Sequence, residues 1–274
     1  REARYALLAR WCRAHNILYL LVAHHAGDQA ETVAMREARR SGARGLAGMS
    51  PVAPPPVPGP RWPLLLRPLL GFTREELSAT LRAAGADWIE DPSNRNPAFT
   101  RVAIRDRLGR DPKERLRLGS LAARARRMRD HMDMALAARA ADAVTLDPAG
   151  FAVVDRRLFA DLPDTLLRHF WARMLITIAG AVYPPRGAGL DRLVGAALDS
   201  GFRGATLHGC RITAGPRRLT VAREYRAAPK DAPYADGMLW DGRFTLRGQA
   251  PAGAVVRPLG RLRPRDAAWL DDLP

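Results

Sequence analysis

Residues 17–32 read ILYLLVAHHAGDQAET, in which an apolar run is followed at once by a group of polar side chains. The run at 17–23 is short and rich in branched residues, as is typical of a strand covered on both faces of a parallel sheet. A helical pattern precedes it over residues 2–15, with apolar positions Tyr5, Leu8, Ala9 and Cys12. Residues 28–40 are helical again, so the segment predicts part of a doubly wound α/β domain.

The polar group after the strand suggests a reaction centre, because ligands of open α/β sheets bind beyond the carboxyl ends of the strands. His24, Asp28 and Glu31 follow a four-then-three spacing, which directs them to one place on a helix. Carboxylates there are suited to Mg²⁺ or an ammonium group, and imidazole to a phosphate or a proton. Two other interpretations stay open: a helix-capping box formed by Asp28 and Glu31, and a metal-hydrolase site formed by His24, His25 and Asp28. No further His/Asp cluster completes the ligand set that the second one needs.

Helix start and stop signals divide residues 41–143 into loops and helices. Glycines punctuate residues 41–48, and residues 51–63 are proline-rich and irregular. Thr73 and Glu76 form a capping box that opens a helix ending at Gly85. A cap, a first-turn proline and an acid at Asp111, Pro112 and Glu114 open a long basic helix to about Ala143. Its predicted apolar stripe is Leu121, Ala125, Met128 and Met132.

The pattern changes after Asp147 to a smaller mixed α+β region. FAVVD is strand-like, and residues 161–179 and 191–198 are helical. LHGCRIT and RRLTVARE flank AGP as one hairpin, and LWDGRFTLRG carries a second one with a DG turn. We therefore expect domains at 1–108 and 146–274, joined by a basic helical linker at 109–145.

The charge and the cysteine content of the chain limit the classes of partner and cofactor that it can bind. The net charge is +16 with a pI of about 11.3, and only Lys113 and Lys230 are lysines, so arginine supplies nearly all of the excess. Arginine forks match phosphates, which favours a nucleic-acid partner; a GC-rich genome accounts for part of the excess. Cys12 and Cys210 form no CxxC pair. No signal peptide or membrane-length apolar run is visible, so we expect a cytoplasmic protein.

The stretch AHHAGDQAETVAMREARRSGARGLAGM, residues 23–49, resembles the signature segment of the tRNA(Ile)-lysidine synthetases, a family of PP-loop (N-type) ATP pyrophosphatases. The likeness extends to ARYALL at 3–8, RPLL at 67–70, W-x-x-DPSN at 88–94 and the arginine pair Arg101 and Arg105. It implies a partial Rossmann-like PP-loop ATPase domain with a parallel sheet, followed by a long linker helix and a smaller α+β domain that binds tRNA or substrate.

The resemblance also implies an activity: ATP adenylates C2 of the wobble cytidine of a tRNA(Ile) with a CAU anticodon, and free L-lysine then displaces AMP. The implied cofactors are ATP and Mg²⁺, and a homodimer stays open as the assembly. The site residues carried over are catalytic Arg4, His24, Asp28 and Glu31; ATP-binding His24, Gly42 and Gly45; metal-binding Asp28; and tRNA-binding Arg101, Arg105, Arg124 and Arg127. Simpler roles stay open, namely exposed helix faces or ion pairs with Asp91 and Asp106 for the arginines, and a helix stop and tight turn for the glycines.

The sequence departs from the family pattern at Gly27, Arg40 and Val102, where the family has Asp, Gly and Asn. The SGGxDS loop that cradles pyrophosphate in the family is absent from the 274 residues. The chain also begins inside a helical pattern without Met, so we expect a piece of a longer chain that is inactive by itself. Two alternative functions remain: another PP-loop tRNA enzyme such as a base thiolase, and a non-catalytic tRNA-binding remnant.

Overall fold

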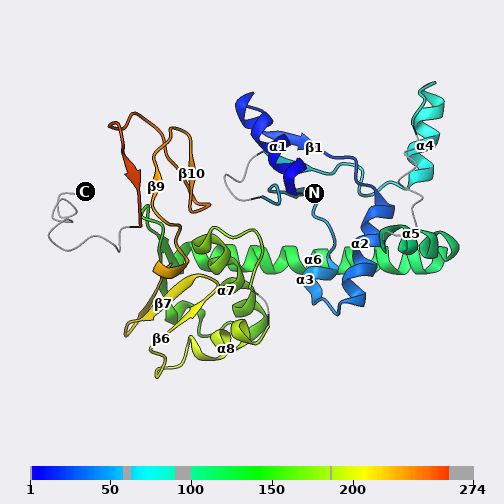
Figure 1. The fold of residues 1–274 in the computed structure, drawn as a ribbon. Coiled ribbons are helices and arrows are strands. Elements are labelled where there is room, and N and C mark those ends of the chain that lie inside the picture. Colours follow the sequence, from blue (N-terminus) through cyan, green and yellow to red (C-terminus); the bar gives the residue numbers. More distant parts are fainter. Residues whose placement is uncertain (1, 58–62, 90–99, 186, 259–274) are drawn as a thin grey trace. The chain divides into compact units, whose positions relative to one another are not determined.

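The computed structural model describes residues 2–57, 63–89, 100–185 and 187–258. They form two compact units, the first made of residues 1–55 and 61–134 and the second of residues 56–60 and 135–274. Figure 1 shows the order of elements along the chain. None of the helices in the described ranges is long and apolar enough to cross a membrane.

The first unit contains a small mixed sheet with strand order β1-β3-β2. β1 (Tyr19–Leu21) pairs in parallel with β3 (Leu64–Leu66), and β2 (Val52–Ala53) pairs antiparallel to β3. Helix α1 (Glu2–Ala14) precedes β1, and α2 (Ala26–Ala38) follows it. The helix–strand–helix order and the parallel pair confirm the predicted partial Rossmann-like α/β domain.

The prediction that the 17–23 run is covered on both faces is wrong in this structure. Leu18, Tyr19 and Leu21 are 58%, 53% and 66% exposed. Only three residues of the run form the strand, and among the described residues β1 has a neighbour on one side alone. Its partner β3 shows the contrast, because Leu65 is fully buried between its neighbours.

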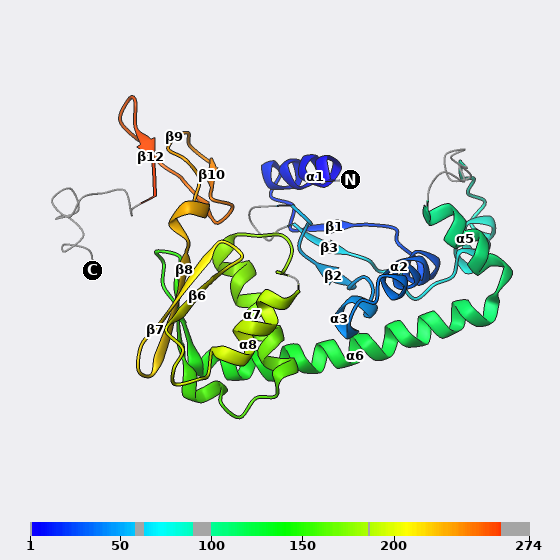
Figure 2. The ribbon, with the colours of Figure 1, turned by 60° about the horizontal axis from the view of Figure 1, so that its bottom comes forward.

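A second part of the first unit is helical. Helix α5 (Thr100–Arg110) and the long helix α6 (Pro112–Ala143) pack with α2 (Figure 2), through buried Ala30, Val33, Ala34, Leu108, Leu118 and Ala122. The predicted cap of α6 is confirmed, since the Asp111 carboxylate accepts the Glu114 amide hydrogen at 2.9 Å. Ala125 of the predicted stripe is buried, but Met128 is 56% exposed. The buried stripe runs instead through Leu118 and Ala122, which face α2 and α5.

Helix α4 (Arg74–Ala83) has the start and the end that its local sequence predicts. Thr73 and Glu76 form the predicted capping box, and Gly85 follows the helix in a left-handed conformation. None of the residues of α4 is buried, so the helix is specified by its caps and not by a core contact. A short helix, α3 (Ala43–Leu46), occupies the glycine-punctuated loop.

The second unit is built on a five-stranded antiparallel sheet with order β4-β5-β8-β7-β6. Its strands are β4 (Val144–Leu146), β5 (Ala152–Asp155), β6 (Gly204–Leu207), β7 (Cys210–Ala214) and β8 (Arg218–Arg223). Helices α7 (Asp164–Ala179) and α8 (Ala188–Ala196) cover one face (Figure 2) and close the larger core around Trp171, Leu175 and Phe159. The predicted strand at 151–155, both helices and the β7–β8 hairpin are confirmed, whereas β4 and β6 were not predicted.

Short strands end the described part of the second unit. β10 (Leu239–Trp240) and β11 (Phe244–Thr245) form the predicted DG hairpin, with Asp241 and Gly242 both at positive φ. β9 (Ala232–Pro233) pairs with β12 (Val255–Val256) after the 3-10 turn η3 (Tyr225–Ala227).

Candidate active site

The start of α2 is fixed by a capping box that involves a histidine. Nδ1 of His25 accepts the Gly27 amide hydrogen at 3.0 Å, and the Asp28 carboxylate accepts the His25 amide hydrogen at 3.0 Å. The predicted box between Asp28 and Glu31 is therefore wrong, because the helix begins at Ala26 and Asp28 is already its third residue. A Cβ at position 27 would lie 2.7 Å from Cε1 of His25, so the ring occupies the space that a side chain there would need.

Glu31 is the buried acid of the first unit. Its side chain is 3% exposed, and Oε1 accepts a hydrogen bond from Nε of Arg105 at 2.7 Å. Oε2 is buried and has no hydrogen-bond partner among the described residues. A buried carboxylate oxygen without a donor is rare and costly, so its presence needs a reason beyond the packing of this helix.

Arg105 links Glu31 to Asp28. The hydrogen bond that Arg105 donates to Glu31 raises the pKa of Arg105 above its ordinary value, and the charges of Glu31, Asp28 and Asp106 raise it further. Burial opposes this effect. The structure therefore brings Asp28, Glu31 and Arg105 into one electrostatic group, in which Glu31 pairs with the guanidinium directly and Asp28 acts on it through its charge.

The loop after α2 is clamped by two side chains that sequence analysis did not single out. Gln29 is buried; its amide donates to the Met49 carbonyl at 3.1 Å and accepts the Met49 amide hydrogen at 2.7 Å. Nη1 of Arg36 donates to the carbonyls of Gly45 and Gly48 at 2.6 and 2.9 Å. The sequence could have indicated a role for Gln29, because it places a polar side chain beside the apolar Ala30 and Val33 on the buried face of α2.

The glycines of this loop differ in their surroundings. Gly48 has φ of +66°, and a Cβ there would meet the Gln29 amide at 2.7 Å, so this position requires glycine. A Cβ at Gly45 would lie 2.6 Å from Cβ of Ser41. Gly42 has open space around it among the described residues. Of the two predicted ATP-binding glycines, Gly42 therefore leaves room for a ligand and Gly45 is packed against its own loop.

The other predicted site residues lie on α1, α5 and α6 and in the loop before α2. Arg4 is exposed on α1 with its guanidinium 5.9 Å from the centroid of the Tyr5 ring, and within the described ranges no hydrogen bond or ion pair joins it to α2. His24 is half-buried in the loop between β1 and α2. Arg101 lies in α5, but its side chain is outside the described part of the structure. Arg124 and Arg127 are exposed and three residues apart on α6.

The three departures from the family pattern have local explanations. Gly27 lies against the His25 ring, as described above. Arg40 has φ of +51°, the left-handed conformation that glycine adopts most easily, so arginine adds strain at this position. Val102 is 8% exposed in α5, where an apolar side chain suits the packing.

The two cysteines and the possible metal ligands are further groups that could react. Both cysteines are buried, and burial raises the pKa of the Cys210 thiol to about 11, which keeps it protonated and unreactive. This disfavours sulfur transfer of the thiolase type. No group of three or more His, Cys, Asp or Glu side chains that could hold a metal ion occurs within the described ranges. One oxygen of Asp28 is already used in the helix cap, where it accepts the His25 amide hydrogen.

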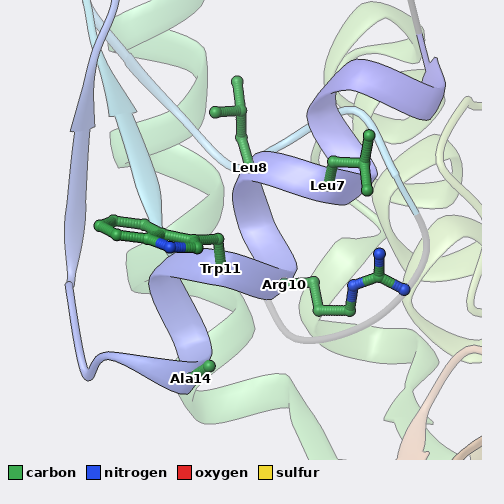
Figure 3. A pocket seen from close by; sticks show the side chains of 5 residues that line it. All are labelled: Leu7, Leu8, Arg10, Trp11 and Ala14. Carbon is green, nitrogen blue, oxygen red and sulfur yellow. The ribbon is translucent and has the colours of Figure 1, made fainter.

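A pocket in the structure lies elsewhere, on α1 (Figure 3). Leu7, Leu8, Arg10, Trp11 and Ala14 line it, so it is apolar and contains none of the predicted site residues. The Trp11 ring stacks on His15, with ring centroids 4.2 Å apart. This surface therefore does not belong to the acid and arginine group on α2 and α5.

Comparison with known proteins assigns the family. A PP-loop domain model matches residues 1–111. Three similar relatives are proteins named tRNA(Ile)-lysidine synthase. The one from Ruegeria pomeroyi is 36% identical over 263 residues, which cover 95% of this chain and 61% of the relative. The one from Hyphomonas neptunium is 41% identical over 235 residues, covering 84% and 62%.

The third relative, from Novosphingobium aromaticivorans, is 38% identical over 233 residues, covering 83% of this chain and 68% of the relative. The chain thus spans about three fifths of the length of the first two relatives. The identity extends beyond the PP-loop domain into the second unit, because 95% of the chain is aligned with the Ruegeria pomeroyi protein. The chain therefore belongs to the tRNA(Ile)-lysidine synthase family of PP-loop proteins.

Proposed function

We propose that the chain contributes the lysine-accepting and tRNA-binding parts of a tRNA(Ile)-lysidine synthase. The reaction is the ATP-dependent ligation of lysine to C2 of the wobble cytidine of a tRNA(Ile) with a CAU anticodon, through an adenylated cytidine. Bond formation consumes ATP to AMP and pyrophosphate. The names of the relatives, which contain both the tRNA and the product, support this proposal.

The observation that carries the proposal is Oε2 of buried Glu31, which has no hydrogen-bond partner in the described part of the chain. An incoming lysine ammonium would complete its hydrogen bonding and its charge balance, because charge-assisted bonds to ammonium are the strong ones. Arg105 already neutralises the other oxygen of the carboxylate at 2.7 Å. The carboxylate is therefore held in a fixed position and retains one acceptor.

The other roles follow the family pattern. Asp28 adds negative charge near Glu31 and is the proposed ligand of Mg²⁺, which would neutralise charge on the phosphates of ATP. His24 and the open Gly42, with Gly45, are proposed to face ATP, and Arg4 to act at the reaction centre. Gln29 and Arg36 support this arrangement by holding the 45–49 loop against α2. Arg101, Arg105, Arg124 and Arg127 are proposed to contact tRNA.

The test is ATP-dependent transfer of labelled lysine to an unmodified transcript of that tRNA. It compares the 274-residue chain with a longer form that contains an SGGxDS segment. We propose that the longer form alone incorporates lysine, because pyrophosphate binding needs the backbone donors of that loop. Glu31→Gln should abolish incorporation by the longer form, and the exposed Glu75→Gln on α4 should not.

A second candidate function is tRNA binding without catalysis. The net charge of +16 and the absence of SGGxDS from these residues favour it. ATP binding by the longer form separates the two: a lysine ligase binds ATP, whereas a form that binds tRNA but neither binds ATP nor incorporates lysine supports the second candidate.

A further inference from the structure

The first turn of α2 is organised around a histidine. His25 has the extended backbone of a residue that precedes a helix, with φ of −121° and ψ of −177°. Its Nδ1 accepts the Gly27 amide hydrogen at 3.0 Å, and its carbonyl accepts the Gln29 amide hydrogen at 3.2 Å. The Ala26 amide donates to the Phe72 carbonyl at 2.9 Å. The side chain of His25 therefore binds one of the amide groups that the helix itself leaves without an acceptor.

The same residue contacts Asp28 in two ways. The His25 amide donates to Oδ2 of Asp28 at 3.0 Å, and Nε2 of the His25 ring lies 3.5 Å from that oxygen. Because Nδ1 accepts a hydrogen bond, the proton of the neutral ring lies on Nε2, the nitrogen close to Asp28. Oδ1 of Asp28 makes no hydrogen bond or ion pair with any described residue. His25 thus holds one oxygen of the carboxylate and leaves the other for a ligand.

Glycine at position 27 allows the ring to lie there. A Cβ built on Gly27 would lie 2.7 Å from Cε1 and 3.1 Å from Nδ1 of His25, so a side chain at this position displaces the ring. Gly27 belongs to the first turn of α2 and is not one of the glycines at positive φ. Glycine in such a helical position costs stability relative to alanine. The space that the ring occupies therefore explains this glycine, and the backbone conformation does not.

The orientation of Asp28 matters for binding at this site. Its side chain is 17% exposed, and its charge acts on Arg105, the guanidinium that pairs with Glu31. Groups that orient the ligands of a metal ion change its affinity by roughly ten- to a hundredfold. The chain also has one acid fewer here than the family pattern, because Gly27 replaces Asp. Binding of a cation therefore depends more on how the remaining acid is held.

We propose that His25 is a positioning residue for Asp28. Its ring, in the space left by Gly27, fixes the first turn of α2 so that Oδ1 of Asp28 is presented to a cation. The inference rests on the proposed function, in which that cation is the ammonium group of lysine or Mg²⁺. The ring acts through Asp28 and touches no substrate. Another good cap residue should therefore replace it, and a side chain at position 27 should undo its effect.

The first experiment uses the 274-residue chain and follows the carboxyl carbon of Asp28 and the ring nitrogens of His25 by NMR, in mildly alkaline buffer where the ring is neutral. The variants are His25→Ala, His25→Asn and Gly27→Ala, with the exposed His131→Ala and Gly119→Ala on α6 as matched controls. The parent ring should carry its proton on Nε2. His25→Ala and Gly27→Ala should shift the Asp28 signal, whereas the controls should not. His25→Asn should leave the signal close to its parent position, because the amide oxygen caps the same backbone group.

The second experiment uses the longer form with an SGGxDS segment and measures KM for lysine, KM for tRNA and the Mg²⁺ concentration that lysine transfer requires. His25→Ala and Gly27→Ala should each raise KM for lysine or the Mg²⁺ requirement by roughly tenfold, with KM for tRNA unchanged. The parameter that changes identifies the cation that Asp28 binds. The double variant should lose no more than either single one, because both substitutions remove the same ring contact.

An Asp28 signal that stays in place in both His25→Ala and Gly27→Ala would overturn the inference, whether or not the longer form is active. Additive losses in the double variant would do the same, as would an equal loss in His25→Asn and His25→Ala. If His25→Ala fails to fold, Gly27→Ala carries the same test, since alanine favours the helix. A longer form that transfers no lysine, combined with the expected shift of the Asp28 signal, contradicts the proposed function alone.

Discussion

Two buried carboxylates, one in each unit, are paired in opposite ways. Asp241 is 2% exposed and is held by two arginines: Arg223 donates to both of its oxygens at 3.1 Å, and Arg243 donates to Oδ2 at 3.0 and 2.7 Å. Glu31 is 3% exposed and has one arginine, with Oε2 left unpaired among the described residues.

The difference is that the hydrogen bonds of one carboxylate are complete and those of the other are not. Around Asp241 the arginines also donate to the carbonyls of Gly209, Ala227 and Gly150, so the network is satisfied within the second unit. It fixes the β10–β11 hairpin to the sheet. Glu31 is half satisfied, and an unpaired buried acceptor costs stability. A fold retains such a group most readily where a ligand completes it.

The largest effect is expected for Asp241→Ala. Removing the shared carboxylate leaves two buried guanidinium groups without a counter-charge, which should destabilise the second unit by about 3–5 kcal/mol. Urea unfolding followed by hydrogen exchange in β7 and β8 measures it. Asp142→Ala, an exposed acid of α6, should stay within about 0.5 kcal/mol of the parent. A small effect of Asp241→Ala would contradict the assignment of a stabilising role to the Asp241 carboxylate.

A smaller loss of stability is expected for Arg105→Met. It leaves Glu31 buried with no partner on either oxygen, at a cost of about 1–3 kcal/mol; the partial exposure of Arg105 limits the effect. Adding Glu31→Gln should recover most of the loss, because the uncompensated charge is then absent. If the double variant is as unstable as the sum of the two single ones, the two side chains are not coupled.

Glu31→Gln alone sharpens the comparison most directly. The substitution keeps the shape of the side chain, and only one ion pair is lost, so the cost in stability should be below about 1.5 kcal/mol. Asp241→Asn, the equivalent change in the second unit, removes the charge that two arginines share and should cost more. Equal losses in paired unfolding measurements would show that both carboxylates serve stability alone.

The smallest effect is expected at the surface of the first unit. Arg117 bridges Glu37 of α2 and Glu114 of α6, with its Nη2 2.6 Å from Glu37. Its hydrogen bonds lower the pKa of both carboxyls below their ordinary value of 4.5. The unfolded chain therefore binds more protons at low pH, and the bridge stabilises the fold above pH 4.5 but not once pH falls through the lowered pKa.

The measurement is the difference in Tm between the parent and Arg117→Ala as a function of pH. The difference should be small near neutral pH, because exposed ion pairs contribute little, and should shrink towards zero in acid. Added salt should reduce it as well. A difference that grows as pH falls would contradict the assigned role of the two glutamates.

The sequence predicted several elements within a few residues and the candidate site only in part. The caps at Thr73 and Asp111 were found because each side chain binds a backbone group three residues away. The DG turn was found because Asp and Gly adopt the positive φ angles that such a turn requires. The alternative capping box at Asp28 and Glu31 lay one turn too late, and the cap at His25 was not foreseen because histidine is not among the common cap residues. The exposure of β1 was missed, since an apolar run does not reveal how many neighbours its strand has.

The sequence by itself determined the family, the local starts and stops of helices, and the presence of two acids on α2. The tertiary structure decided which group pairs with Glu31, because that partner lies 74 residues away on α5. It also decided that Arg156 and Arg157 join Arg217 and Arg218 at one end of a sheet. Propensities act over a few bonds along the chain, whereas burial and charge pairing depend on distance in space, and the fold alone sets that distance.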